Sequence, residues 1–133
     1  MICANRDRKA RIGAKFMLAI WALMVSVGFV ALGDVAMSEL PTLVLAIGLL
    51  SIPVGIALAA GVLARGPALT VLSGGFAATT AVLAIWLLWE AFTSTSSTAP
   101  IAFVFYPVVE VAVLCPVLLA GALIDLLLRR SAP

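Results

Sequence analysis

The chain has 133 residues, of which 65% are hydrophobic and 11% are charged, and its mean hydropathy is +1.28. Soluble domains are nearer half apolar and a quarter charged, so this composition predicts an integral membrane protein. At about 20 apolar residues per membrane-spanning helix, the length allows about four spans and no separate soluble domain. A large extramembrane catalytic domain, a nucleotide-binding fold with a Gly-rich phosphate loop and a disulfide scaffold are therefore excluded.

The charged residues divide the chain into four long apolar segments. The charges lie in the N-terminal stretch that ends at Lys15, and then at Asp34, Glu39, Arg65, Glu90, Glu110, Asp125, Arg129 and Arg130. We predict spans at about 15–33, 41–64, 68–92 and 101–128, preceded by a basic tail over residues 1–14. The predicted fold is an all-α integral membrane protein, with residues 1–133 forming one four-transmembrane-helix bundle.

Proline, glycine and hydroxyl residues mark the predicted connections. Pro41 suits a helix start, and Arg65-Gly66-Pro67 combines a helix stop with the next start, which predicts a tight hairpin between the second and third spans. The polar stretch from Thr93 to Pro100 is predicted to join the third and fourth spans.

The positions of Lys and Arg predict the orientation in the membrane. Five of the eight basic residues lie in the N-terminal stretch that ends at Lys15, one is Arg65, and two lie at the C-terminal end. Basic residues gather on the cytoplasmic side, so we expect a multi-pass protein of the cell membrane with both termini cytoplasmic. The tail could also bind anionic lipid headgroups, but a topology signal is the favoured interpretation. A secretory signal peptide is disfavoured, because the uncharged stretch from Phe16 to Gly33 is long for one.

Cysteine and histidine usage argues against metal, haem and thiol chemistry. The chain has no histidine; Cys3 lies in the tail and Cys115 lies deep in the fourth predicted span. We therefore expect no disulfide, no metal site and no cofactor. A Ser-His or Cys-His catalytic pair is impossible within this chain.

Small residues at four-residue spacing predict close helix packing. The second predicted span has Ser51, Gly55 and Ala59 in one row and Ala57 and Gly61 in another, and the third pairs Gly74 with Ala78 and Gly75 with Thr79. Such rows let helix backbones approach one another in lipid. We expect them to pack within the chain rather than build a homodimer, and we expect Gly55→Leu to lower the melting temperature.

Glu110 is the main candidate for a functional residue. It lies about 13 Å along the fourth predicted span from the outer end, inside the ~30 Å hydrocarbon layer. An ionised carboxylate is expensive there, so Glu110 should be neutral, paired, hydrated or turned into the bundle. Tyr106, Pro107, Gly121 and Asp125 share its helix face, which predicts one polar seam. Pro107 and Pro116 leave two alternatives open, a kinked or partly unwound helix and simple tolerance of proline.

The sequence also suggests what surrounds Glu110. Every Lys and Arg is near the cytoplasmic side, so no cation is available, and we expect the carboxyl to be protonated. Glu90 follows Trp86 and Trp89 in an interfacial pattern, about 12 Å above Glu110 in depth. Asp125 and Arg129 are expected to form an i,i+4 ion pair. The candidate catalytic residues are Glu110 and Glu90, and the candidate ligand-binding residues are Tyr106, Trp86, Ser26, Ser51, Thr79 and Phe103. Thr79 and Thr80 are both expected near the middle of the bilayer, where a hydroxyl can donate to a carboxylate.

Three classes of function fit this pattern. The first is a transport protein that handles a proton, a cation or a lipophilic ligand at Glu110. The second is a membrane-embedded enzyme of the isomerase or cyclase type, with Glu110 as general acid for a lipophilic substrate. The third is an accessory subunit of a larger membrane complex. The expected partners are the lipid bilayer and a lipophilic or cationic small molecule, with homo-oligomers left open and no nucleic acid.

Overall fold

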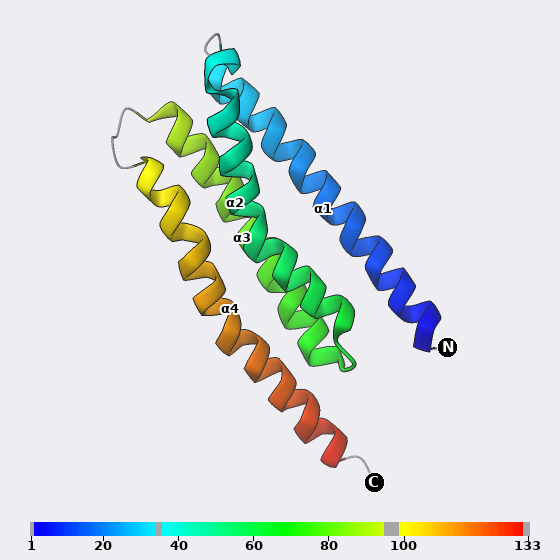
Figure 1. Ribbon diagram of the computed structural model, residues 1–133. Coiled ribbons are helices and arrows are strands. Elements are labelled where there is room, and N and C mark those ends of the chain that lie inside the picture. Colours follow the sequence, from blue (N-terminus) through cyan, green and yellow to red (C-terminus); the bar gives the residue numbers. More distant parts are fainter. Residues whose placement is uncertain (1, 34–35, 95–98, 132–133) are drawn as a thin grey trace.

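Four long helices make up the computed structural model: α1 (Ile2–Leu32), α2 (Ala36–Leu63), α3 (Pro67–Thr93) and α4 (Ala99–Arg130) (Figure 1). The structure describes residues 2–33, 36–94 and 99–131, without the side chains of residues 2–4, 36, 37, 99, 100, 102 and 103. Each helix contains a stretch that is long and apolar enough to cross a membrane. The described residues confirm the predictions of an all-α fold and of four helices able to span a membrane, and the chain has the character of a multi-pass membrane protein.

Two helices begin earlier than the sequence predicts. Helix α1 starts at Ile2, so residues 2–14 of the expected basic tail are helical; this stretch contains Arg, Lys and Ala, which favour helices. Helix α2 starts at Ala36 rather than at Pro41, which lies within the helix. Helix α4 runs through Pro107 and Pro116 without a break. These prolines remove single backbone hydrogen bonds, which membrane helices tolerate.

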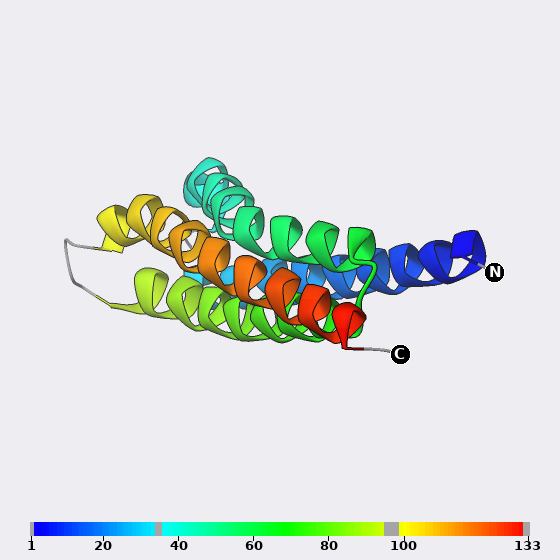
Figure 2. The ribbon, with the colours of Figure 1, turned by 90° about the horizontal axis from the view of Figure 1, so that it is seen from below.

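The α2–α3 hairpin occupies the centre of the bundle. Helices α1 and α4 each contact both α2 and α3, and the described residues of α1 and α4 do not contact one another. Viewed from below, α2 and α3 lie on opposite sides, with α4 in front and α1 behind (Figure 2). The start of α1 and the end of α4 lie at the same end of the bundle as the α2–α3 turn (Figure 1). We call this end the basic end, because Arg6, Arg65 and Arg129 lie there.

Small residues allow the helices to pack closely. Ala57 on α2 and Ala77 and Ala84 on α3 are fully buried. A Cβ added to Gly61 would lie 2.7 Å from Ser73 Oγ, and one added to Gly121 would lie 3.0 Å from Leu69 Cα. The row formed by Ala57 and Gly61 is therefore confirmed as a packing surface.

The other predicted small-residue rows are not tight packing surfaces. A Cβ added to Gly55 would meet only Met17 Cε, at 3.9 Å, and one added to Gly74 or Gly75 would meet nothing within 4 Å. Ala59 is exposed. The expectation that Gly55→Leu destabilises the protein is therefore not supported, because the row that contains it leaves room for a side chain.

Candidate functional site

A hydrogen bond joins Glu110 on α4 to Thr80 on α3. The Thr80 hydroxyl donates to Glu110 Oε2 at 3.0 Å, and only 1% of Thr80 is exposed. Thr80 lies 13 residues from each end of α3, which corresponds to about 20 Å of helix in either direction. In a helix that spans a bilayer this position is near the middle, so the bond holds the Glu110 carboxyl at that depth.

Tyr106 completes the cluster. Its hydroxyl donates to the Thr80 backbone oxygen at 3.2 Å, and it lies close enough to the Glu110 carboxyl to interact with it. Tyr106 and Glu110 are four residues apart on α4, so they share one face of that helix. The sequence predicted both residues on a polar seam, and the structure places both against Thr80. We call Thr80, Tyr106 and Glu110 the carboxyl cluster.

The carboxyl cluster is far from the basic end. Arg129 lies 19 residues beyond Glu110 on the same continuous helix, or about 28 Å along its axis. Lys9 and the other described basic residues of α1 are on a helix that does not contact α4. A carboxyl group in hydrocarbon is neutralised by a proton or by a cation, and within the described residues Glu110 forms no ion pair. A proton or an incoming cation therefore has to balance its charge.

The remaining candidate ligand-binding residues do not join the carboxyl cluster. Thr79 is exposed and donates to Gly75 O, so its neighbour Thr80 is the hydroxyl that reaches Glu110. Ser26 is exposed and donates to Ala22 O. Trp86 is 59% exposed. The side chains of Phe103 and Cys3, like residue Asp34, lie outside what the structure describes.

Ser51 belongs to a different polar contact, between α1 and α2. The Trp21 indole N–H donates to Ser51 Oγ at 2.9 Å, and Ser51 in turn donates to Ile47 O at 2.6 Å. Trp21 was not among the site residues predicted from the sequence. An indole on an apolar helix that needs an acceptor was the signal available for it.

Glu90 is not brought to Glu110. It lies ten residues beyond Thr80 on α3, or about 15 Å along the helix towards the end opposite the basic end. Its side chain is exposed, and its backbone oxygen accepts the Ser94 N–H at the end of α3. The structure therefore places the two candidate catalytic carboxylates in separate environments.

Asp125 forms the second strong polar contact of the bundle. Its two carboxylate oxygens accept the backbone N–H groups of Ala68 and Leu69, each at 3.0 Å. These donors belong to the first turn of α3, whose N-cap residue, Gly66, has no side chain to cap them. Asp125 therefore caps α3 from α4. The expected ion pair with Arg129 is wrong, because the buried carboxylate is turned to α3 instead.

Lys9 closes the opposite side of the same turn. Its ammonium group donates to Ala64 O at 3.3 Å and to Thr70 Oγ1 at 3.0 Å. Ala64 follows the last residue of α2, where carbonyl groups carry partial negative charge and have no partner within the helix. One cation of α1 and one carboxylate of α4 thus hold the α2–α3 turn.

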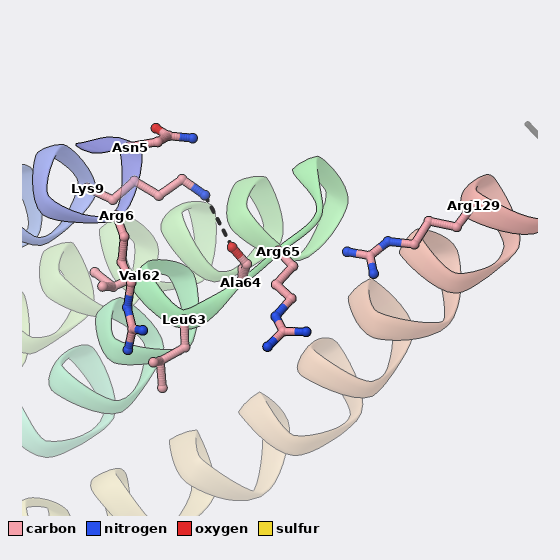
Figure 3. A pocket seen from close by; sticks show the side chains of 8 residues that line it. All are labelled: Asn5, Arg6, Lys9, Val62, Leu63, Ala64, Arg65 and Arg129. Atoms are coloured by element: carbon pink, nitrogen blue, oxygen red, sulfur yellow. Dashed lines mark hydrogen bonds between the residues drawn. The ribbon is translucent and has the colours of Figure 1, made fainter. Parts of the chain in front are cut away.

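Of the cavities that adjoin the turn at the basic end, two share Lys9 and Val62. The larger, about 870 Å³, is lined by Arg6 and Lys9 of α1, Arg65 of the turn and Arg129 of α4, together with Asn5, Val62, Leu63 and Ala64 (Figure 3). The other, about 350 Å³, is an apolar groove between α1, α2 and α3. Neither cavity is lined by a residue of the carboxyl cluster.

No known relative guides the assignment of this site, since no protein-family model, curated protein or solved structure matches the chain. Within the described ranges no three His, Cys, Asp or Glu side chains gather as a metal site would require. The function has to be argued from the chemistry of the cluster.

Proposed function

We propose that this is a multi-pass protein of the cell membrane that exchanges a proton for a small lipophilic cation at Glu110, and so transports that cation. The observation that carries the proposal is the hydrogen bond from Thr80 to the Glu110 carboxyl, because Thr80 lies at the centre of α3, a helix long and apolar enough to cross a membrane. Among the described residues no basic side chain pairs with this carboxyl, so its charge has to be balanced by a proton or, when the proton leaves, by a cation.

The two states exclude one another, which is the requirement for coupled exchange. One carboxyl accepts either a proton or the charge of a cation, so the arrival of one favours the departure of the other. Thr80 and Tyr106 supply hydroxyl groups that keep the carboxyl in place in either state. The side chains of α3 and α4 are mostly apolar, which favours a cation with apolar substituents over a hydrated metal ion.

We expect Glu110→Gln to abolish cation transport, because the amide cannot release a proton. The measurement is ethidium movement into proteoliposomes under an imposed pH gradient, with proton movement followed by an internal pH dye.

Thr80→Val should reduce the rate of transport by about tenfold or less, because it removes one hydrogen bond worth roughly 0.5–1.5 kcal/mol but leaves the carboxyl. Glu39→Gln, at an exposed acid near the start of α2, is the matched control and should transport at the wild-type rate. Equal rates in the wild type, in Glu110→Gln and in protein-free vesicles would overturn the proposal.

The proposal includes an orientation with the basic end in the cytoplasm. In a variant without Cys3 and Cys115, a cysteine at Thr93 should react with an impermeant maleimide added to intact cells, and a cysteine at Ser131 should react only after the cells are opened. Thr93 and Ser131 are exposed and lie at opposite ends of the bundle. The reverse pattern of labelling would overturn the orientation.

A membrane-embedded acid–base enzyme is the second candidate, and the pairing of Tyr106 with Glu110 favours it. Two protic groups on one helix face can donate and accept a proton at the same substrate atom. The two candidates differ in what remains with the purified protein: the enzyme should convert a lipophilic substrate without any gradient, whereas the transporter needs two compartments.

A further inference from the structure

The cavity at the basic end collects cations from three separate parts of the chain. Arg6 and Lys9 come from α1, Arg65 from the α2–α3 turn, and Arg129 from the last turn of α4. Figure 3 shows Arg129 extending from α4 towards the turn, and Lys9 bonded to the end of α2. The described residues of α1 and α4 do not contact one another, and the cavity lies where both helices approach the turn.

No acidic side chain is among the described residues that line this cavity. Asp125 lines a neighbouring cavity with Arg65 and Arg129, and its two carboxylate oxygens accept the Ala68 and Leu69 N–H groups. Within the described part of the chain, the guanidinium groups of Arg6, Arg65 and Arg129 form no hydrogen bond or ion pair, whereas Lys9 is bonded to Ala64 and Thr70. Three guanidinium groups with free donors repel one another unless an anion lies between them, and guanidinium matches the geometry of phosphate oxygens.

An apolar groove leads from this cavity along the bundle. The groove between α1, α2 and α3 shares Lys9 and Val62 with the basic cavity, and it is walled by Phe16, Ala57 and Ala78. Gly74 on its floor leaves open space, because a Cβ there would meet nothing within 4 Å. A basic cavity at the membrane surface that continues into an apolar groove has the shape and polarity of a lipid rather than of a soluble anion.

We propose that the basic cavity binds the phosphate of an anionic phospholipid, with an acyl chain of the same molecule lying in the apolar groove. Arg6, Arg65 and Arg129 bind the phosphate oxygens, and Lys9 holds the turn beneath them. The site is separate from the carboxyl cluster and does not depend on the transport proposal.

A topology signal alone makes a different prediction. That signal depends on how many Lys and Arg residues lie near the membrane on one side, and not on which of them surround a cavity. A set of basic residues from the same end that does not line the cavity therefore provides the control. Arg8, Arg11 and Arg130 form such a set.

The test compares two triple variants by native mass spectrometry in detergent with added phosphatidylglycerol. Arg6→Gln with Arg65→Gln and Arg129→Gln should weaken lipid binding at least tenfold. The control variant removes the same charge and should change the affinity for the lipid less than twofold; it combines Arg8→Gln, Arg11→Gln and Arg130→Gln. Within the described residues the cavity arginines form no hydrogen bond or ion pair, so both variants should melt like the wild type without added lipid. Equal weakening in both variants would reduce the effect to net charge and overturn the proposal.

Two further arms identify the occupant. Gly74→Leu fills the apolar groove and should weaken phosphatidylglycerol binding, whereas Gly75→Leu, at an equally open neighbour outside the groove, should not. Equal binding by both glycine variants would overturn the placement of the acyl chain. If phosphatidylcholine bound as tightly as phosphatidylglycerol, the occupant would not be an anionic phospholipid. The same would follow if inorganic phosphate alone raised the melting temperature as much as phosphatidylglycerol does.

Discussion

Asp125→Ala is expected to lower the free energy of unfolding by about 2–4 kcal/mol, because charge-assisted hydrogen bonds contribute about 1.5–3 kcal/mol each and a helix cap about 0.5–2 kcal/mol. Its two carboxylate oxygens are the acceptors for the Ala68 and Leu69 N–H groups, and Gly66 cannot replace them. The measurement is unfolding in mixed micelles with increasing SDS. Glu39→Ala, which removes an exposed acid, should unfold like the wild type. A wild-type curve for Asp125→Ala would show that the α3 N-terminus has another partner.

A double-mutant cycle with Gly66 isolates the contact. A Cβ at Gly66 would overlap the Asp125 carboxylate, so Gly66→Ala should displace it and destabilise the protein. In the Asp125→Ala background the same change should cost little, because the obstructing group is gone and the Gly66 backbone conformation (φ −112°, ψ 160°) is open to alanine. Additive effects of the two substitutions would contradict the direct cap.

Gly121→Leu should be the most disruptive substitution in the α3–α4 interface. A Cβ at this position would already lie 3.0 Å from Leu69 Cα, and backbone cannot move aside as a side chain does. Overpacking costs about 1–3 kcal/mol, and separating α3 from α4 would also pull Asp125, one turn away, off its donors. The same SDS titration should show that Gly121→Leu lowers the free energy of unfolding by at least this amount.

Ala120→Leu is the matched control, because Ala120 is exposed on the neighbouring position of α4. It adds the same bulk to the same turn and should unfold within about 0.5 kcal/mol of the wild type. If the two leucine variants were equally destabilised, the added bulk would act on helix α4 itself and not on its interface with α3 at Gly121.

The number of helices and the face of Glu110 could be predicted because simple periodicities determine them. Charges cannot lie in hydrocarbon without a cost, so their spacing marked the spans. Helical periodicity placed Tyr106 and Glu110 on one face, and the structure places both against Thr80. The early start of α1 was not predicted, because charged residues mark the boundary of a membrane-spanning segment, whereas the helix itself can continue beyond that boundary.

Contacts between helices were harder to predict. Thr79 and Thr80 are adjacent and chemically identical, and only the rotation of α3 against α4 decides that Thr80 faces Glu110. The rotation of α2 likewise turns Gly61 towards α3 and leaves room around Gly55. Asp125 was assigned to Arg129 because the i,i+4 pair is local, whereas the true partners lie more than fifty residues away. The absence of a capping side chain at Gly66 was the one signal that α3 needed an acceptor from elsewhere.

The central claim is that Glu110 exchanges its proton for a cation, and infrared difference spectroscopy tests it most directly. The purified protein in lipid should show a carboxylic acid C=O band that is absent in Glu110→Gln and shifted in Thr80→Val, since Thr80 donates to this carboxyl. Adding ethidium should remove the band and release a proton to the buffer. A Glu110 band that neither ethidium nor pH alters would contradict the account, and an accessory subunit with a structural glutamic acid would then explain the cluster better.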